Sequence, residues 1–219
     1  MKGERHPDTL STRYLHADVL SSLGRYGEAL AEIDASAPIE AEVKSERHPD
    51  TLSARYLRSQ VLGNLGRNGE ALAEIDAFAP IQVEVLGVRH PDTLSTRYLR
   101  AQVLSNLGRY GEALAEIDAH APIRVEVQGE RHPATLTTRS LRIGVEIAEG
   151  RNIDRASELG QIVTALAEAT GAHSRQTLSA RYRLSRLLLL LGDRVPTRGV
   201  GAKLLSSVGC VVRLSQLAS

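Results

Sequence analysis

The side chains that could perform chemistry in this sequence recur once in each of several similar segments. Histidine and aspartate are the clearest cases, and either residue type can bind a metal ion or transfer a proton. The recurring residues are His6, His48, His90, His132 and His173, and Asp34, Asp76 and Asp118. A catalytic or metal site needs different side chains that converge on one point, whereas these are spread along the chain. We therefore expect no metal site and no catalytic site, and we interpret the histidines as helix caps or loop contacts.

Composition removes further classes of function. Cys210 is the single cysteine, which excludes an internal disulfide or a cysteine metal cluster and favours a reducing cytoplasm. The formal net charge of +1 argues against nucleic acid or an anionic membrane as partner. No apolar run is long enough to span a membrane, and no phosphate-binding loop motif occurs. The excess of arginine over lysine, 24 to 3, is typical of a bacterial genome rich in G and C. We predict a cytoplasmic protein that is not an enzyme and needs no cofactor.

A 42-residue repeat organises the chain. The hexapeptide Arg-His-Pro-Asp-Thr-Leu begins at Arg5, Arg47 and Arg89, and altered copies begin at Arg131 and His173. Residues 46–87 and 88–129 differ at only 8 of 42 positions. A period of this length indicates stacked units that supply each other's core. We predict a single domain over residues 1–219, with repeats at about 4–45, 46–87, 88–129, 130–171 and 172–219. The last is degenerate, and residues 200–217 are expected to form a closing helix with Cys210 on its apolar side.

Each repeat is predicted to form two antiparallel helices. In the third repeat, His90-Pro91-Asp92-Thr93 is typical of a helix start, and Gly108 of a helix end. Apolar residues between them recur at intervals of three and four, as they do again from Ala113 to Val125.

Proline disturbs the second helix of the first three repeats. Pro38, Pro80 and Pro122 lie within it, where proline removes a backbone hydrogen bond. We expect the helix to kink or to restart at the proline. The alternation of residues 122–127 leaves a strand as the alternative.

Two sequence stretches carry a resemblance to a known family. Leu-Gly-Arg-Tyr-Gly-Glu-Ala-Leu at 107–114 is followed, after a helix, by Gly-Glu-Arg-His-Pro at 129–133. Together they resemble the 42-residue tetratricopeptide repeats of kinesin light chains and their bacterial relatives. The resemblance implies an all-α fold, a right-handed superhelical solenoid of about five helix pairs. Its concave wall, lined mainly by first helices, would bind peptides or protein surfaces. The asparagine with which relatives contact peptide backbone is replaced here, by Leu57-Arg58 and Leu99-Arg100 among others.

The resemblance also assigns candidate partner-binding residues to the concave face. They are tyrosines beside small polar residues, a composition suited to adaptable recognition, although a solvated face is the alternative. The candidates are Ser11, Tyr14, Asp18, Ser21, Ser22, Ser53, Tyr56, Arg58, Gln60, Asn64, Ser95, Tyr98, Arg100, Gln102, Ser105 and Asn106.

Arginine forms a second periodic series. It consists of Arg13, Arg55, Arg97, Arg139 and Arg181, with Arg58, Arg100 and Arg142 one turn further along. Such a ladder could bind an acidic peptide or a phosphate backbone. The alternative, which we favour, is a structural role in ion pairs with Glu28, Glu70 and Glu112.

The sequence therefore predicts a non-catalytic scaffold that binds a peptide or protein partner. An alternative is a detached or truncated arm of a signalling ATPase, because bacterial relatives often serve as such arms. Nucleic-acid binding through the arginines is less favoured. The chain starts directly on a repeat, so the first repeat could also mediate self-association.

Overall fold

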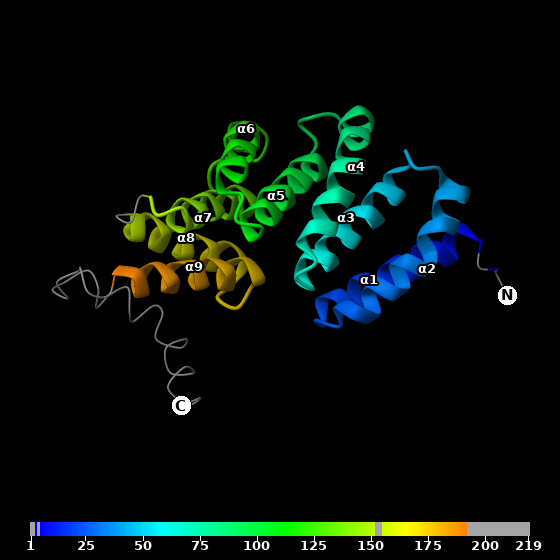
Figure 1. Ribbon diagram of the computed structural model, residues 1–219, viewed down its shortest axis with the longest axis horizontal. Helices are drawn as coiled ribbons and strands as arrows, with labels where there is room; N and C mark the ends of the chain where they lie inside the picture. The colour runs from blue at the N-terminus through cyan, green and yellow to red at the C-terminus, as the bar shows by residue number, and fades with distance from the viewer. Residues whose placement is uncertain (1–2, 4, 152–154, 192–219) are drawn as a thin grey trace. The chain divides into compact units, whose positions relative to one another are not determined.

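Helices make up the architecture of the computed structural model, which describes residues 3, 5–151 and 155–191 (Figure 1). No strand occurs in those residues. The helices are α1 (Pro7–Ser22), α2 (Tyr26–Lys44), α3 (Pro49–Asn64), α4 (Asn68–Leu86), α5 (Pro91–Asn106), α6 (Tyr110–Gln128), α7 (Pro133–Ala148), α8 (Ala156–Thr170) and α9 (Arg175–Leu191). The predicted all-α fold of consecutive helix pairs is confirmed. The predicted helix at 200–217, with Cys210, lies outside the described residues.

Histidine caps the first helix of each of the first four repeats. The Nδ1 atoms of His6, His48, His90 and His132 accept the backbone N–H two residues later, at 3.1–3.2 Å. Proline follows each cap as the first helical residue, where its missing N–H costs nothing. The predicted capping role is thus confirmed for these four.

The fifth histidine does not share this role. His173 lies in the turn before α9, and Ser174 occupies the position that is equivalent to the capping histidines. The Ser174 hydroxyl oxygen accepts the N–H of Thr177 at 3.2 Å. The 42-residue period is kept here, because Ser174 lies 42 residues after His132, and His173 occupies the position of Arg131 instead.

The second helices run through their prolines. Residues 26–44 form one helix that includes Pro38, and α4 and α6 include Pro80 and Pro122 in the same way. The expected restart at proline is wrong, and so is the strand alternative. Pro38 and Pro80 are exposed, as are Asp34 and Asp76 four residues earlier. The two carbonyl groups that lose a helical hydrogen bond therefore belong to residues at the water-facing side, which lowers the cost of the proline.

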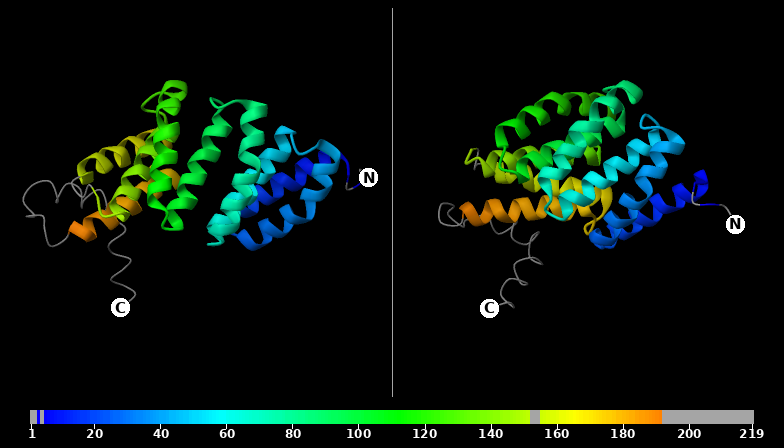
Figure 2. Two further views of the ribbon diagram at one scale, coloured as in Figure 1. Left: turned by 45° about the horizontal axis from the view of Figure 1, so that its top comes forward. Right: turned by 45° about the vertical axis from the view of Figure 1, so that its right-hand side comes forward.

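The chain separates into two compact units, one up to His120 and one from Ala121 onward. In the first unit α1 packs on α2, α2 on α3, α3 on α4 and α4 on α5 (Figure 2). Its core consists of aliphatic side chains from these helices, together with Phe78, which is fully buried. The Arg55 guanidinium lies over the Phe78 ring, 5.6 Å from its centre. Small aliphatic residues fill a stack of helix pairs, so the chain needs few aromatic rings.

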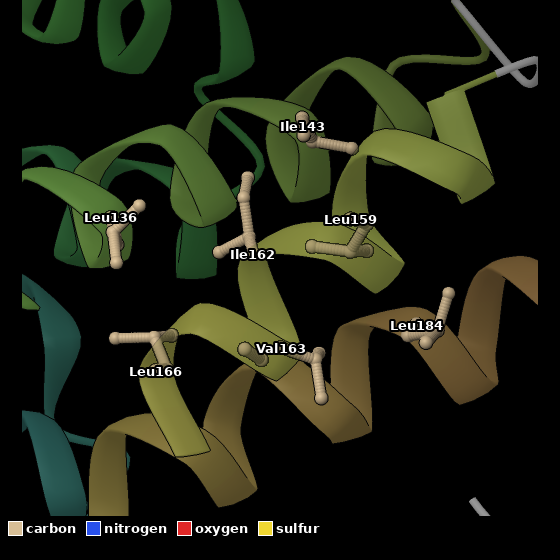
Figure 3. Packing of buried hydrophobic residues seen from close by; sticks show 8 residues of the cluster. Leu136, Ile143, Leu159, Ile162, Val163, Leu166 and Leu184 are labelled. Atoms are coloured by element: carbon tan, nitrogen blue, oxygen red, sulfur yellow. The ribbon is translucent and has the colours of Figure 1, made fainter. Parts of the chain in front are cut away.

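The second unit contains a core formed by α7, α8 and α9 (Figure 3). Ile143 from α7, Leu159 and Leu166 from α8, and Leu184 from α9 are all fully buried. Gly144 lets α9 approach closely, because the Arg183 side chain would lie 3.0 Å from a Cβ at that position. Arg183 also donates a hydrogen bond to the Ser140 hydroxyl at 3.1 Å. The degenerate last repeat therefore still packs its first helix on the preceding pair.

Candidate functional site

Two adjacent hollows lie along the first helices of the first three repeats. The first hollow, of about 270 Å³, is lined by Ser11, Tyr14, Leu15, Glu40, Lys44, Asp50 and Ser53. The second hollow, of about 220 Å³, is lined by Tyr14, Ser53, Tyr56, Gln82, Asp92 and Ser95. Tyr14 and Ser53 border both hollows, so the two form one continuous surface, which we call the groove. All of these residues belong to the first unit.

The groove brings together part of the predicted binding set. Ser11, Tyr14, Ser53, Tyr56 and Ser95 line it, and they come from α1, α3 and α5. These are the helices that the family resemblance assigns to the binding face. Contact of these side chains with a partner stays a prediction.

The other predicted candidates do not line the two hollows. Some are half-buried, namely Gln60, Tyr98, Gln102 and Ser105, and others are exposed, namely Ser22, Asn64 and Asn106, whereas Ser21 is buried. The Asn106 amide donates a hydrogen bond to the Asn68 side-chain oxygen at 3.2 Å, at the ends of α5 and α4. Asp18 is exposed on α1 and lies close enough to Tyr14 to affect its ionisation.

Sequence reasoning missed several residues of the groove. Glu40, Lys44 and Gln82 come from the ends of second helices, and Asp50 and Asp92 come from the first turns of α3 and α5. A signal for part of this set existed in the sequence. Position 82 is one of the few at which two nearly identical repeats differ, and variation between copies can mark a surface with its own specificity.

The groove is electrically negative. Burial raises the pKa of Tyr14, and the carboxylates of Asp18, Asp92, Glu40 and Asp50 raise it further. Burial also raises the pKa of Glu40, against the opposing effect of Lys44. The Lys44 ammonium lies 2.8 Å from the Asp50 carboxylate and 3.3 Å from that of Glu40. The lining of the groove thus contains three carboxylates, of Glu40, Asp50 and Asp92, and one ammonium group.

The arginine ladder serves the stacking of helices. Arg13, Arg55 and Arg97 each donate through Nε to a glutamate of the same repeat at 2.6 Å; the acceptors are Glu32, Glu74 and Glu116. The prediction that these arginines pair with Glu28, Glu70 and Glu112 is wrong. These glutamates bind Arg25, Arg67 and Arg109 instead, which stand immediately before α2, α4 and α6. A structural role is confirmed for these ladder arginines, with different glutamates.

Arg58 and Arg100 connect neighbouring repeats. Arg58 donates to Asp34 of the preceding repeat at 2.8 Å and to Glu74 of its own repeat at 3.0 Å. Arg100 repeats the arrangement with Asp76 and Glu116, at 2.8 and 3.1 Å. Arg58 lines a further cleft of about 470 Å³ between α2 and α3, together with Pro38, Ala41 and Ala54, and this cleft shares Glu40 with the first hollow. Both arginines were predicted to bind a partner; their guanidinium groups form ion pairs, neither lines the two hollows, and contact with a partner stays a prediction.

Within the part of the chain that the structure describes, no group of three His, Cys, Asp or Glu side chains could hold a metal ion. In the same part, no helix combines the length and the apolar character that crossing a membrane requires.

Comparison with known proteins identifies the fold. No family model and no curated protein matches the sequence. Among solved structures, the chain is similar to the nearly identical TPR-like repeats of a candidate kinesin light chain from Podosopora anserina. The TM-score is 0.68 and the sequence identity is 21%, and the match covers 96% of this chain and 98% of that chain. A variant of the same repeats with one glutamine replaced by methionine matches with a TM-score of 0.69 and 19% identity, over 99% of both chains.

The chain is therefore a helical repeat protein with the TPR-like fold. Its helix pairs and its 42-residue period agree with the predicted resemblance. Neither similarity supports the alternative role as an arm of a signalling ATPase.

Proposed function

We propose that this protein is a non-catalytic scaffold that binds an extended segment of a partner protein in the groove. The observation that carries the proposal is the continuity of the two hollows. Side chains from α1, α3 and α5, which are far apart in the sequence, line one surface through the shared residues Tyr14 and Ser53.

The chemistry of the groove suits a peptide. Tyrosine offers a large rigid ring with a polar end, and serine offers a small donor and acceptor, so the pair can contact backbone and side chains of many sequences. Tyr14 and Tyr56 are half-buried, which limits the entropy lost when a partner binds. In the first three repeats, ladder arginines that could have bound an acidic partner or a nucleic acid are already paired with carboxylates.

A displayed library of random octapeptides tests this function directly. Panning against the full chain should enrich a family of related sequences. Replacing Tyr14→Ala and Tyr56→Ala together should weaken the enriched peptides by about tenfold or more, because two aromatic contacts are lost.

Tyr182→Ala is the matched control. Tyr182 lies on α9, in the second unit, with 61% of its surface exposed, so its loss should leave peptide affinity unchanged. A library that yields no enriched family would refute the proposed function. Peptides that lose affinity with Tyr182→Ala but not with the double variant would place the binding surface elsewhere.

A second proposal is self-association through the first repeat. Leu15 and Val19 on α1 are 60% and 55% exposed, whereas their equivalents Leu57 and Val61 on α3 are 2% and 0% exposed. The first helix pair, α1 and α2, packs against the equivalent face of the second repeat. A helix pair of this chain can therefore cover such a face. We infer that a second copy of the chain covers Leu15 and Val19; because Leu15 also lines the first hollow, this association competes there with a partner segment.

A further inference from the structure

The two hollows are the same site in consecutive repeats. Five positions of the first hollow have their equivalents, 42 residues later, in the second: Ser11 as Ser53, Tyr14 as Tyr56, Glu40 as Gln82, Asp50 as Asp92 and Ser53 as Ser95. The first hollow also contains Lys44, whose equivalent is Leu86. The copies therefore share most of their polar lining but differ at two charged positions, where glutamate becomes glutamine and lysine becomes leucine.

In the first hollow the chain supplies its own lysine. The Lys44 ammonium lies 2.8 Å from Asp50 Oδ2 and 3.3 Å from Glu40 Oε1, and its side chain is only 8% exposed. The hydrogen bond from Lys44 lowers the pKa of Asp50. This arrangement shows, within the same molecule, which kind of group the lining accommodates.

The second hollow keeps the aspartate, as Asp92, but has the Gln82 amide in place of the Glu40 carboxylate, and no lysine lines it. Among the residues that line it, Asp92 is charged and none is basic. His90 lies beside Asp92, but its Nδ1 atom accepts a hydrogen bond from the Asp92 backbone N–H at 3.2 Å. Because that nitrogen acts as an acceptor, it cannot donate a hydrogen bond to the Asp92 carboxylate.

Gln82 supplies an independent sign of a missing donor. It lines the second hollow with 2% of its surface exposed, and its Oε1 atom has no hydrogen-bond partner in the described structure. A buried acceptor left unpaired is costly, so such atoms usually meet a donor in the functional state. Its equivalent in the first hollow, Glu40, accepts from Lys44.

We propose that the second hollow receives a lysine side chain of the partner segment, in the place that Lys44 takes in the first hollow. This inference rests on the proposed peptide-binding function. An ammonium group has three donors and no acceptor, which matches the Asp92 carboxylate and the Gln82 carbonyl. The bordering rings of Tyr14 and Tyr56 add a surface that attracts cations. The partner segment is therefore basic.

Fluorescein-labelled octalysine and octaglutamate are the probes for the test. Octalysine should bind the full chain, and octaglutamate should not.

Leu86→Lys places an internal ammonium in the second hollow and should weaken octalysine binding by about tenfold, because it removes a charge-assisted contact. Lys44→Leu empties the first hollow and should tighten octalysine binding. Leu107→Lys adds the same charge at a residue that is 39% exposed and lines neither hollow, so it should change the affinity less than about twofold.

Asp92→Asn is the second variant, in case Leu86→Lys disturbs folding. Asp92 has 63% of its side chain exposed, so the substitution should preserve the fold while it also weakens octalysine about tenfold. Octalysine affinity that is equal in the wild type, Leu86→Lys and Asp92→Asn would overturn the inference, as would stronger binding of octaglutamate.

The octapeptide library separates this inference from the proposed function. Enriched peptides that contain lysine and lose affinity with Leu86→Lys support both. Enriched peptides without basic residues, which still depend on Tyr14 and Tyr56, would retain the function and overturn the lysine site. A library with no enriched family would overturn both.

Discussion

The ionisation of the Tyr14 side chain reports the negative charge of the groove. Tyr14 borders both hollows, and its pKa is raised by burial and by carboxylates on α1, α2, α3 and α5. Raising the pKa means that the folded protein favours the neutral phenol. Because the unfolded chain ionises at the ordinary value near pH 10, stability falls as the pH rises above about 10.

A tyrosinate titration followed by absorbance at about 295 nm checks this behaviour. We expect a late component in the wild type that disappears in Tyr14→Phe, and stability that falls less steeply above about pH 10 in that variant. Asp92→Asn should shift the late component to lower pH, because a carboxylate that disfavours tyrosinate is removed. A late component that survives in Tyr14→Phe would show that another tyrosine produces it.

Proline within the second helix is the unusual feature at the level of single elements. A proline inside a helix costs about 3 kcal/mol relative to alanine, yet α2, α4 and α6 each contain one. At Pro80 the unsatisfied carbonyl belongs to Asp76, and both residues are exposed. Packing of α4 against α3 and α5 holds the helix in place on its other side.

Pro80→Ala should therefore stabilise the protein. The alanine N–H can donate to the Asp76 carbonyl, and we expect a gain of about 1–3 kcal/mol, reduced by the greater freedom of the unfolded chain. Thermal unfolding followed by circular dichroism measures the change. Pro49→Ala is the control: Pro49 is the first residue of α3, where proline is favourable, so this variant should be neutral or slightly less stable. A loss of stability in Pro80→Ala would mean that the proline ring itself supports the packing.

The first repeat presents an open stacking face. Leu15 and Val19 are exposed because the structure places no helix pair on them, whereas inner repeats bury the equivalent residues. Each repeat of such an array depends on its neighbours for part of its core. An association of two copies through this face would bury Leu15 and Val19.

Sedimentation equilibrium tests that association. We expect the wild type to form dimers at micromolar concentration, and the double variant Leu15→Gln and Val19→Gln to shift toward monomer by about tenfold in dissociation constant. Leu65→Gln is the control, because Leu65 has a similar apolar side chain, is 40% exposed, and lies at the end of α3 in an inner repeat. A wild type that is monomeric at these concentrations would refute self-association.

The 42-residue period, the helix starts and the helix ends could be predicted from sequence because each depends on residues close together in the chain. His48 caps α3 through a contact two residues away, and Gly108 ends α5 through its own backbone conformation, with φ of +75°. The apolar spacing of α5 likewise identified Leu94, Ala101 and Leu104 as buried. The groove residues on first helices followed from the family resemblance.

The ion pairs between helices, the continuity of the helices through proline and the lining of the groove depend on how the helices pack. Arg55 pairs with Glu74 rather than Glu70 because the crossing of α3 and α4 sets which glutamate faces it. The helices continue through Pro80 because tertiary contacts outweigh a local preference. The acidic lining of the groove, with Asp92 and Gln82 beside Tyr14, joins residues of three helices whose proximity no local pattern encodes. Side chains distant in sequence meet only when the repeats stack, and stacking is a property of the folded chain.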